Sequence, residues 1–232
     1  MTHDLRTPLH AVTGYSELLD LGITGPLTTE QRNQVLRIRH SARHLLGLVN
    51  EVLDLAKVEA GALAVSNRPI GIDRVMDAAI ALVQPLAESR DIALSADCED
   101  PHALFDGDEE RVRQILVNLL SNAIKFTRPG GSVRARCSLA RHPDRNARVS
   151  GSGPWICVCV EDTGIGIAPD QLAAIFDPFV QVGSGHTREA EGSGLGLTTS
   201  RRLARLMGGD LTASSEPGEG SVSSANFADW RE

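Results

Sequence analysis

Two helical stretches with narrow apolar seams restrict how the first 61 residues can fold. In the first stretch, from His3 to about Asp20, apolar residues recur at heptad-like spacing and Ser16 completes the seam; they are Leu5, Leu9, Val12 and Leu19. The second stretch keeps alternating steps of three and four up to Gly61, through Ile38, Ser41, Leu45, Leu48, Val52 and Leu55. Two such helices cannot bury both seams by themselves, so we expect an antiparallel hairpin that dimerises into a four-helix bundle. Packing of the seams against the rest of the chain is the alternative.

After Gly61 the sequence changes to a mixture of helical and strand-like segments. The patterns predict helices at 73–89, 108–127 and 197–207 and strands at 63–66, 92–96, 132–139 and 155–161, with further strands at the C-terminus. The segment 140–153 is rich in Arg, Pro, Gly and Ser, which is typical of an exposed hairpin connection. Helices in this order with an antiparallel or mixed sheet predict an α/β sandwich, so the whole chain is expected to be of the α+β class.

The composition excludes several classes of protein. The formal net charge of −7 argues against a nucleic-acid-binding surface, which needs a clustered basic face. No run approaches the ~18 consecutive apolar residues of a membrane helix, and the N-terminus lacks the apolar core of a signal peptide. The cysteines lack the spacing of a zinc site, so we expect reduced thiols. We therefore expect a cytoplasmic chain without membrane contact, although the full-length protein can carry a membrane anchor upstream of it.

The predicted helix at 108–127 has one apolar and one polar face. Its apolar stripe is formed by Val112, Ile115, Leu116, Leu119 and Ala123. Asn118, Asn122 and Lys125 lie at i, i+4 and i+7 and therefore share a different face. Amide oxygens are suitable ligands for Mg²⁺, and the ammonium of Lys125, one of two lysines in the chain, would offset phosphate charge. The face is a candidate metal and phosphate site, with a solvated polar face as the alternative.

A carboxylate followed by two glycines ends the predicted strand at 155–161. Gly164 and Gly166 come shortly after Asp162 and allow a tight backbone turn beside a ligand. The Asp162 carboxylate would accept a hydrogen bond from the exocyclic amine of adenine, whereas guanine has a carbonyl acceptor at the matching position. The alternative is an ordinary strand-to-turn connection in which the aspartate caps the turn.

A second glycine-rich stretch opens the last predicted helix. Gly192, Gly194 and Gly196 allow successive backbone N–H groups to face a phosphate at the positive end of that helix. No predicted strand comes directly before these glycines, which disfavours a dinucleotide-binding fold. Between the two glycine stretches, 175–180 supplies an aromatic anchor and 183–191 a polar loop, a combination typical of a lid over a ligand.

His3 stands at the start of the first predicted helix, with Asp4 beside it and Thr7 one turn later. An unprotonated imidazole nitrogen is a competent nucleophile near neutral pH, and a neighbouring carboxylate can orient the ring and accept its proton. His3 is therefore a candidate nucleophile, with an ordinary surface histidine as the alternative.

Together these segments resemble the sensor histidine kinases of two-component systems, and the likeness covers nearly the whole chain in the expected order. The family's H box is similar to His3-Asp-Leu-Arg-Thr-Pro-Leu9, and its N box is similar to Asn118-Leu-Leu-Ser-Asn-Ala-Ile-Lys-Phe-Thr127. Its first glycine box resembles Asp162-Thr-Gly-Ile-Gly166, and its F box resembles Phe176-Asp-Pro-Phe179. Its second glycine box resembles Gly192-Ser-Gly-Leu-Gly-Leu197. The resemblance implies a dimerisation and histidine phosphotransfer domain at 1–61 and a catalytic, ATP-binding α/β sandwich at 62–232.

The resemblance also implies roles for the motif residues in binding ATP and Mg²⁺. Asn118 and Asn122 would hold Mg²⁺ and phosphate, and Lys125 would contact phosphate. Phe126 would border the nucleotide, and Asp162 would bind adenine. The remaining residues expected to line the nucleotide are Gly164, Gly166, Gly192, Gly194, Leu195, Gly196 and Leu197.

By the same resemblance, the chain is expected to autophosphorylate His3 from ATP and to pass the phosphoryl group to an aspartate on a response-regulator receiver domain. Asp4 would assist proton removal from His3, and Thr7 would position water when the same protein dephosphorylates its partner. Relatives extend the first helix well upstream of the histidine, whereas only Met1 and Thr2 precede His3. A first helical turn frays, so either the chain is a fragment or His3 is poorly held. We expect weakened dimerisation and autophosphorylation but intact nucleotide binding.

Two other functions stay open at the level of sequence. An ATPase of the same nucleotide-binding superfamily, which includes heat-shock chaperones and type II topoisomerases, needs a carboxylate one helical turn before the Mg²⁺-binding asparagine to activate water. That position is Asn118, whose amide cannot act as a base, so transfer to His3 is favoured over hydrolysis. A non-catalytic dimeric scaffold that binds a response regulator through its hairpin is the second alternative.

Overall fold

The chain divides into two compact units, residues 1–63 and 64–232. The computed structural model describes residues 2–66, 68–143, 146–149, 153–181 and 193–229, with the backbone alone described at 2–5. Within these ranges no helix combines the length and the apolar character needed to cross a bilayer.

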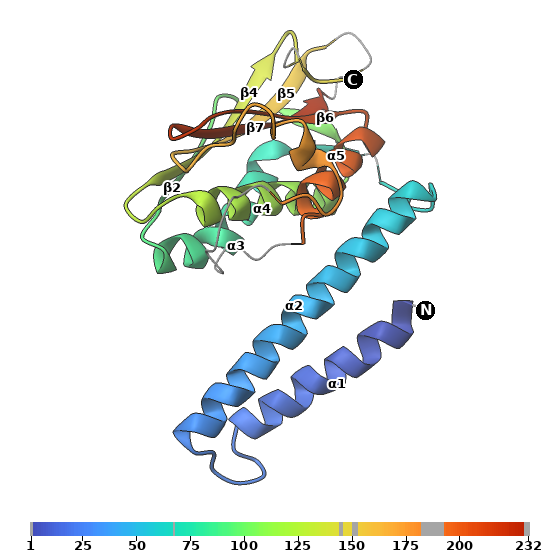
Figure 1. Cartoon of the computed structure of the whole chain (residues 1–232). Helices are drawn as coiled ribbons and strands as arrows, with labels where there is room; N and C mark the ends of the chain where they lie inside the picture. The colour runs from blue at the N-terminus through green and yellow to red at the C-terminus, as the bar shows by residue number, and fades with distance from the viewer. Residues whose placement is uncertain (1, 67, 144–145, 150–152, 182–192, 230–232) are drawn as a thin grey trace. The chain divides into compact units, whose positions relative to one another are not determined.

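The first unit is a helical hairpin of α1 (Thr2–Asp20) and α2 (Thr29–Glu59), drawn in blue in Figure 1. A reciprocal capping box starts α2, because the Thr28 hydroxyl accepts from the Gln31 N–H at 3.2 Å and the Gln31 side chain accepts from the Thr28 N–H at 2.9 Å. Gly61, with a φ of +63°, ends the helix in the left-handed conformation expected of a glycine there. Both ends of α2 are therefore fixed by local chemistry.

Ion pairs between the two helices hold the hairpin in register. Asp20 pairs with Arg39 at 3.1 Å, and Glu17 pairs with Arg43 at 2.8 Å. The Arg6 Nε–H donates to the side-chain oxygen of Asn50 at 2.9 Å, at the opposite end of the hairpin. These contacts set the antiparallel pairing that the sequence predicts.

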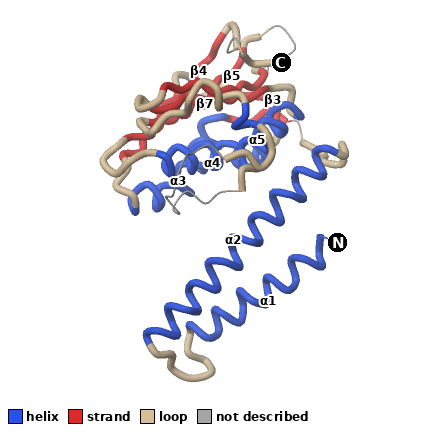
Figure 2. The backbone as a smooth tube through the Cα atoms, in the orientation of Figure 1, coloured by secondary structure: helices blue, strands red, loops and turns tan. Residues whose placement is uncertain are grey.

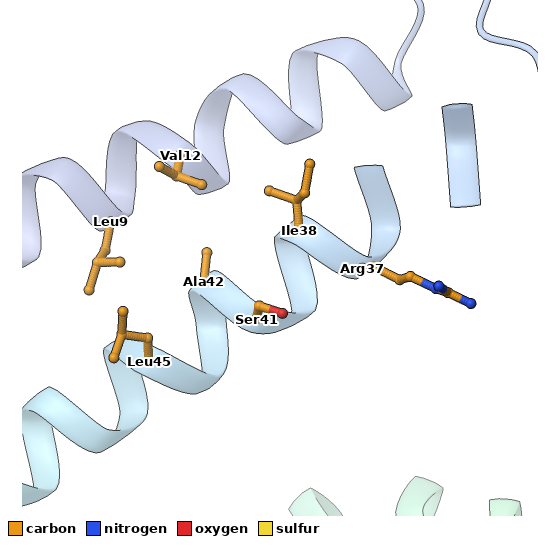
Figure 3. Close-up of a pocket in the computed structure, with 7 residues that line it drawn as sticks. All are labelled: Leu9, Val12, Arg37, Ile38, Ser41, Ala42 and Leu45. Atoms are coloured by element: carbon orange, nitrogen blue, oxygen red, sulfur yellow. The ribbon is translucent and has the colours of Figure 1, made fainter. Parts of the chain in front are cut away.

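One hairpin does not bury its own seam. Four residues of the predicted seams remain 41–51% exposed; they are Val12, Ile38, Leu45 and Val52. Between the helices lies an open hollow of about 380 Å³ (Figure 3), lined by Leu9, Val12, Arg37, Ile38, Ser41, Ala42 and Leu45. Ser16 is buried, and its hydroxyl donates to the Val12 carbonyl at 2.7 Å. An apolar strip along the hairpin is thus left open to solvent.

The second unit is built on a five-stranded sheet. The strands lie in the order β2-β4-β5-β7-β6, with β2 and β4 parallel and the other neighbours antiparallel. Their bounds are Ala93–Cys98 (β2), Ser132–Ala140 (β4), Trp155–Asp162 (β5), Asp210–Glu216 (β6) and Gly220–Ala228 (β7). A separate antiparallel pair joins β1 (Arg68–Gly71) to β3 (Leu104–Gly107).

Three helices cover one face of this sheet, as the tube in Figure 2 shows. They are α3 (Ile72–Ser89), α4 (Glu109–Phe126) and α5 (Gly196–Leu206), accompanied by the short 3-10 turn η1 (Ala174–Phe176). Along β4, Val133 and Ala135 are buried while Arg134 is exposed, because successive side chains point to opposite faces of a strand. The core lies between the inner face of the sheet and the helices, and the predicted α/β sandwich is confirmed.

The predicted helices of this unit are confirmed, but one predicted strand is wrong. Residues 63–66 form no strand, and the Ser66 N–H donates to the Asp108 carboxylate at 3.0 Å instead of to a neighbouring strand. The strand lies a few residues later, at β1, where it pairs with the unforeseen strand β3. Short strands of this kind depend on a distant partner, so their own residues carry little signal. The connection at 140–153 does join two antiparallel strands, β4 and β5, as predicted.

Candidate functional site

The polar face of α4 is presented by a helix that is firmly anchored on its other side. The Asp108 carboxylate caps the helix by accepting from the N–H groups of Glu110 and Arg111 at 3.1 and 3.2 Å. The predicted apolar stripe is buried, together with two further residues; the full set is Val112, Ile115, Leu116, Leu119, Leu120, Ala123 and Ile124. Burial of this stripe leaves Asn118 and Asn122 half-buried on a separate face. The Asn122 Nδ2 lies 3.5 Å from the Asn118 Oδ1, so the two amides are neighbours.

Asn118 is also the point where α4 meets α5. Its Nδ2 donates to the hydroxyl of Ser200 at 3.0 Å. A Cβ atom added at Gly196 would lie 2.3 Å from the Asn118 Oδ1, so this approach requires a glycine. The polar face of α4 and the second glycine stretch are therefore brought into direct contact. Ser200 was not predicted, because nothing local marks it as the partner of an amide on another helix.

The C-terminal end of α4 lies against the first glycine stretch. The Lys125 Nζ is 5.1 Å from the centroid of the Phe126 ring, and the Phe126 carbonyl accepts from the Ile165 N–H at 3.3 Å. A Cβ atom at Gly164 would lie 2.6 Å from both the Phe126 carbonyl oxygen and the Asp162 Oδ1. The absence of a side chain at Gly164 thus lets the turn after β5 close onto α4.

Asp162 ends β5 with its carboxylate half-buried beside this turn. Burial raises the pKa of the Asp162 carboxyl group, and backbone hydrogen bonds from Gly164 and Ser221 partly oppose that rise. The Gly164 N–H donates to the Asp162 Oδ1 at 2.8 Å. Gly166 has a φ of +67°, and a Cβ atom there would lie 2.0 Å from the Glu216 carbonyl oxygen. The first glycine stretch therefore holds a partly desolvated acceptor in a tightly fitted turn.

The second glycine stretch leads into α5 with a left-handed residue. Gly194 has a φ of +69°, and its carbonyl accepts from the Phe179 N–H at 3.0 Å. Leu195, 1% exposed, places its side chain in the core and leaves only its backbone for a ligand. The N-cap residue, Leu195, makes no side-chain hydrogen bond to the first turn of α5, at Gly196 and Leu197. Uncapped N–H groups at a helix start favour an anion. Gly192 lies outside the described residues.

The predicted phosphoacceptor group belongs to the other unit of the chain. His3 and Asp4 lie in the first turn of α1, and their side chains fall outside the described residues. Thr7 lies one turn after His3 on the same helix and is exposed. The structure thus brings the described candidates for nucleotide binding together in the second unit and places the predicted phosphoacceptor on the hairpin.

The arrangement suits a ligand with a phosphate chain at one end and an amine-bearing ring at the other. Amide oxygens and N–H groups without an N-cap side chain meet where α4 contacts α5. An ammonium lies beside Phe126 at the C-terminal end of α4, and a carboxylate lies at the end of β5. Within the described ranges, no group of three or more His, Cys, Asp or Glu side chains gathers into a metal site. A metal ion at this place would therefore depend on amide and phosphate oxygens.

Two family models match the chain. Residues 107–229 match a family described as "Histidine kinase-, DNA gyrase B-, and HSP90-like ATPase". Residues 1–61 match "His Kinase A (phospho-acceptor) domain".

Curated proteins and a solved structure match over almost the whole chain. Sensor protein GacS of Pseudomonas syringae pv. syringae is 37% identical over 222 residues, 95% of this chain and 23% of that protein. Autoinducer 2 sensor kinase/phosphatase LuxQ of Vibrio parahaemolyticus is 36% identical over 223 residues, 96% of this chain and 25% of that protein. The crystal structure of full-length ShkA in complex with AMPPNP has a TM-score of 0.79 and 36% identity, covering 100% of this chain and 45% of that one. The chain thus spans less than half the length of each of these three relatives.

Proposed function

Because this chain belongs to the sensor histidine kinases, we propose that it binds ATP with Mg²⁺ and transfers the γ-phosphoryl group to the imidazole of His3. The observation that carries the proposal is the junction at Asn118, where the polar face of α4 meets the glycines that begin α5. A triphosphate held there would meet amide oxygens on one side and backbone N–H groups on the other.

In this proposal the two ends of the nucleotide are recognised by different groups. The Asp162 carboxylate accepts from the exocyclic amine of adenine, beside the turn formed by Gly164 and Gly166. The Lys125 ammonium offsets phosphate charge, and Phe126 borders the nucleotide. The ShkA structure, in complex with AMPPNP, an analogue of ATP, supports a nucleotide site in this fold.

We assign Mg²⁺ to Asn118 and Asn122. The donor set fits the ion, because Mg²⁺ prefers hard oxygen ligands and keeps several water molecules when few side chains reach it. When bound, the ion would neutralise charge on the phosphate oxygens. The two amides orient the triphosphate, and the first turn of α5 binds its anionic oxygens through backbone N–H groups.

In the transfer step, His3 in the proposed phosphoacceptor domain, residues 1–61, receives the phosphoryl group from ATP bound in the proposed catalytic domain, residues 62–232. A ring nitrogen of His3 attacks the γ-phosphorus; the N–P bond forms while the P–O bond to ADP breaks, and ADP leaves. Asp4 accepts the proton from the other ring nitrogen. The phosphoryl group then passes to an aspartate of a response-regulator receiver domain.

We also propose that the chain acts as a homodimer and has a second activity. The open apolar strip of the hairpin, including Ile38 and Leu45, supports pairing with a second copy into a four-helix bundle. Thr7 would position water for dephosphorylation of the response regulator, and the name of LuxQ, a sensor kinase/phosphatase, supports that second activity.

Incubation of the purified chain with γ-labelled ATP and Mg²⁺ tests the proposal. We expect an acid-labile, alkali-stable label on the protein, lost in His3→Gln and kept in the matched control His10→Gln, which alters an exposed histidine of the same helix. Steady phosphate release without labelled protein would show that the chain hydrolyses ATP and does not transfer the phosphoryl group to His3. If neither labelled protein nor phosphate release is detected, the chain is a non-catalytic scaffold.

A further inference from the structure

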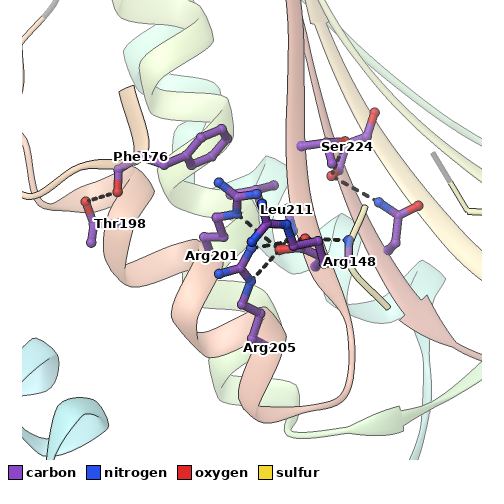
Figure 4. Close-up of polar contacts among 10 residues, drawn as sticks. Arg148, Phe176, Thr198, Arg201, Arg205, Leu211 and Ser224 are labelled. Atoms are coloured by element: carbon purple, nitrogen blue, oxygen red, sulfur yellow. Dashed lines mark hydrogen bonds and ion pairs between the residues drawn. The ribbon is translucent and has the colours of Figure 1, made fainter. Parts of the chain in front are cut away.

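The turn that begins at Phe176 is fastened to α5 at two points. The Thr198 hydroxyl donates to the Phe176 carbonyl at 2.9 Å, and the Arg201 guanidinium lies 4.4 Å from the centroid of the Phe176 ring (Figure 4). Thr198 and Arg201 are separated by one turn of the helix, so they project towards the same neighbour. A guanidinium over an aromatic face is attracted by the negative charge of the ring face.

These two contacts bridge a hollow beside the turn. A hollow of about 210 Å³ separates the turn from α5, and its walls include Phe176, Asp177, Pro178, Thr198, Arg201 and Arg205. Side chains fill this gap only in part, although Ile175, directly before Phe176, is buried. The hydrogen bond and the ring contact therefore help to fix the placement of the turn across this gap.

Arg201 is itself held by a fully buried carboxylate. The Asp210 side chain is 0% exposed and accepts from the Arg201 Nε at 3.2 Å and from the Arg205 Nε at 2.8 Å. Backbone N–H groups of Arg148 and Leu211 donate to the same carboxylate at 2.8 and 2.9 Å. Burial tends to raise the pKa of Asp210, but the hydrogen bonds, led by that from Arg205, outweigh it and lower the pKa. The carboxylate therefore stays ionised and fixes the Arg201 guanidinium.

The fastened turn reaches the beginning of α5. Phe179, three residues after Phe176, has a φ of +64°, and its N–H donates to the Gly194 carbonyl at 3.0 Å. Gly194 lies two residues before α5 begins, and Gly196, the first residue of α5, lies against the side chain of Asn118. A shift of the Phe176 turn would thus move the backbone that is proposed to receive phosphate.

We propose that Asp210 and Arg201 are positioning residues for nucleotide binding, acting through the Phe176 ring on the first turn of α5. Neither residue needs to touch the nucleotide. The inference rests on the proposed ATP site and adds to it a requirement for an ionised carboxylate at the start of β6. Small displacements of binding groups cost much of the binding energy, so the effect is expected in nucleotide affinity.

A double-mutant cycle tests this inference, with ATP affinity measured by calorimetry in the presence of Mg²⁺. Arg201→Gln and Phe176→Leu should each weaken ATP binding by roughly three- to tenfold, the range expected for a partly shielded cation–π contact. The double variant should be no weaker than the weaker single variant, because both changes break the same contact. Asp210→Asn should resemble Arg201→Gln in affinity.

Arg205→Gln is the matched control, because the described ring contact is made by Arg201, and Arg201 and the backbone N–H groups of Arg148 and Leu211 still hold the Asp210 carboxylate in that variant. It should lower the melting temperature as Arg201→Gln does and change ATP affinity by less than about twofold. If the two arginine variants lose equal ATP affinity, or if the losses in the cycle are additive, Asp210 only stabilises the fold and the positioning role is contradicted. If the unaltered chain fails to bind ATP, the proposed function falls and takes this inference with it.

Discussion

The side-chain amide of Asn118 donates to the hydroxyl of Ser200 at 3.0 Å, across 82 positions of the chain. This hydrogen bond joins the polar face of α4 to the helix that begins at the second glycine stretch. It leaves the Asn118 Oδ1 directed at Gly196 and next to Asn122. The orientation of a proposed Mg²⁺ ligand is thus fixed by a residue outside the recognised motifs.

Ser200→Ala is expected to weaken Mg²⁺-dependent ATP binding. Loss of one hydrogen bond that orients Asn118 should cost about 0.5–1.5 kcal/mol, roughly a two- to twelvefold rise in Kd by calorimetry. Ser121→Ala is the control, because the Ser121 hydroxyl donates to the Asn118 backbone carbonyl and not to its side chain. Equal Kd values for the Ser200 variant and the unaltered chain would show that the amide does not need this partner.

Gly196→Ala is expected to abolish ATP binding in a folded chain. The new Cβ atom would lie 2.3 Å from the Asn118 Oδ1, so either the amide or the start of α5 must move. Gly47→Ala is the control: it also adds a methyl group to a glycine in a helix, but nothing lies within 4 Å of it. That control should stabilise the chain by about 0.5–1 kcal/mol. Retained ATP affinity in the Gly196 variant would argue against close apposition of α4 and α5.

Two neighbouring threonines of α5 should respond in opposite directions to replacement by valine. Both are buried, but the Thr198 hydroxyl donates to the Phe176 carbonyl, whereas the Thr199 hydroxyl has no partner in the part of the chain that is described. Thr199→Val removes an unsatisfied buried polar group and should raise the free energy of unfolding by about 1 kcal/mol. Thr198→Val should lower it by a similar amount. Chemical denaturation measures both, and a destabilised Thr199 variant would mean that its hydroxyl is satisfied in solution.

The raised pKa of Asp162 predicts a pH dependence of adenine recognition. Below that pKa the carboxyl group is protonated and accepts less strongly, so ATP affinity should fall as the pH is lowered, starting above the usual range for aspartate. Without ligand the sign for stability is opposite: the raised pKa favours the folded state at low pH, and this contribution is lost as the pH rises through it. Asp162→Asn should flatten the pH profile of ATP affinity and reduce discrimination against GTP. An unchanged profile in that variant would assign the pH dependence to another group.

The sequence predicts those features that depend on local pattern. The spacing of Val112, Leu116 and Leu119 indicates the buried face of α4, and the same helical period places Asn118 and Asn122 together. Gly61 ends α2 as predicted, because a left-handed C-cap is a local requirement.

What the sequence does not predict are contacts between distant segments. The pairing of β1 with β3 joins two four-residue strands on either side of α3 and β2, and neither strand has a strong pattern of its own. The contact of Arg201 with Phe176 and its pairing with Asp210 likewise depend on how three elements meet. From the sequence alone, an arginine on this helix is predicted to be a solvated residue, because the buried carboxylate that it contacts lies on another element.

A crystal structure of the chain with AMPPNP and Mg²⁺ tests the central claim most directly. The account predicts phosphate oxygens at the junction of Asn118, Asn122 and the first turn of α5, with the adenine amine within hydrogen-bonding distance of the Asp162 carboxylate. A nucleotide bound elsewhere, with α4 and α5 free of phosphate, would contradict it.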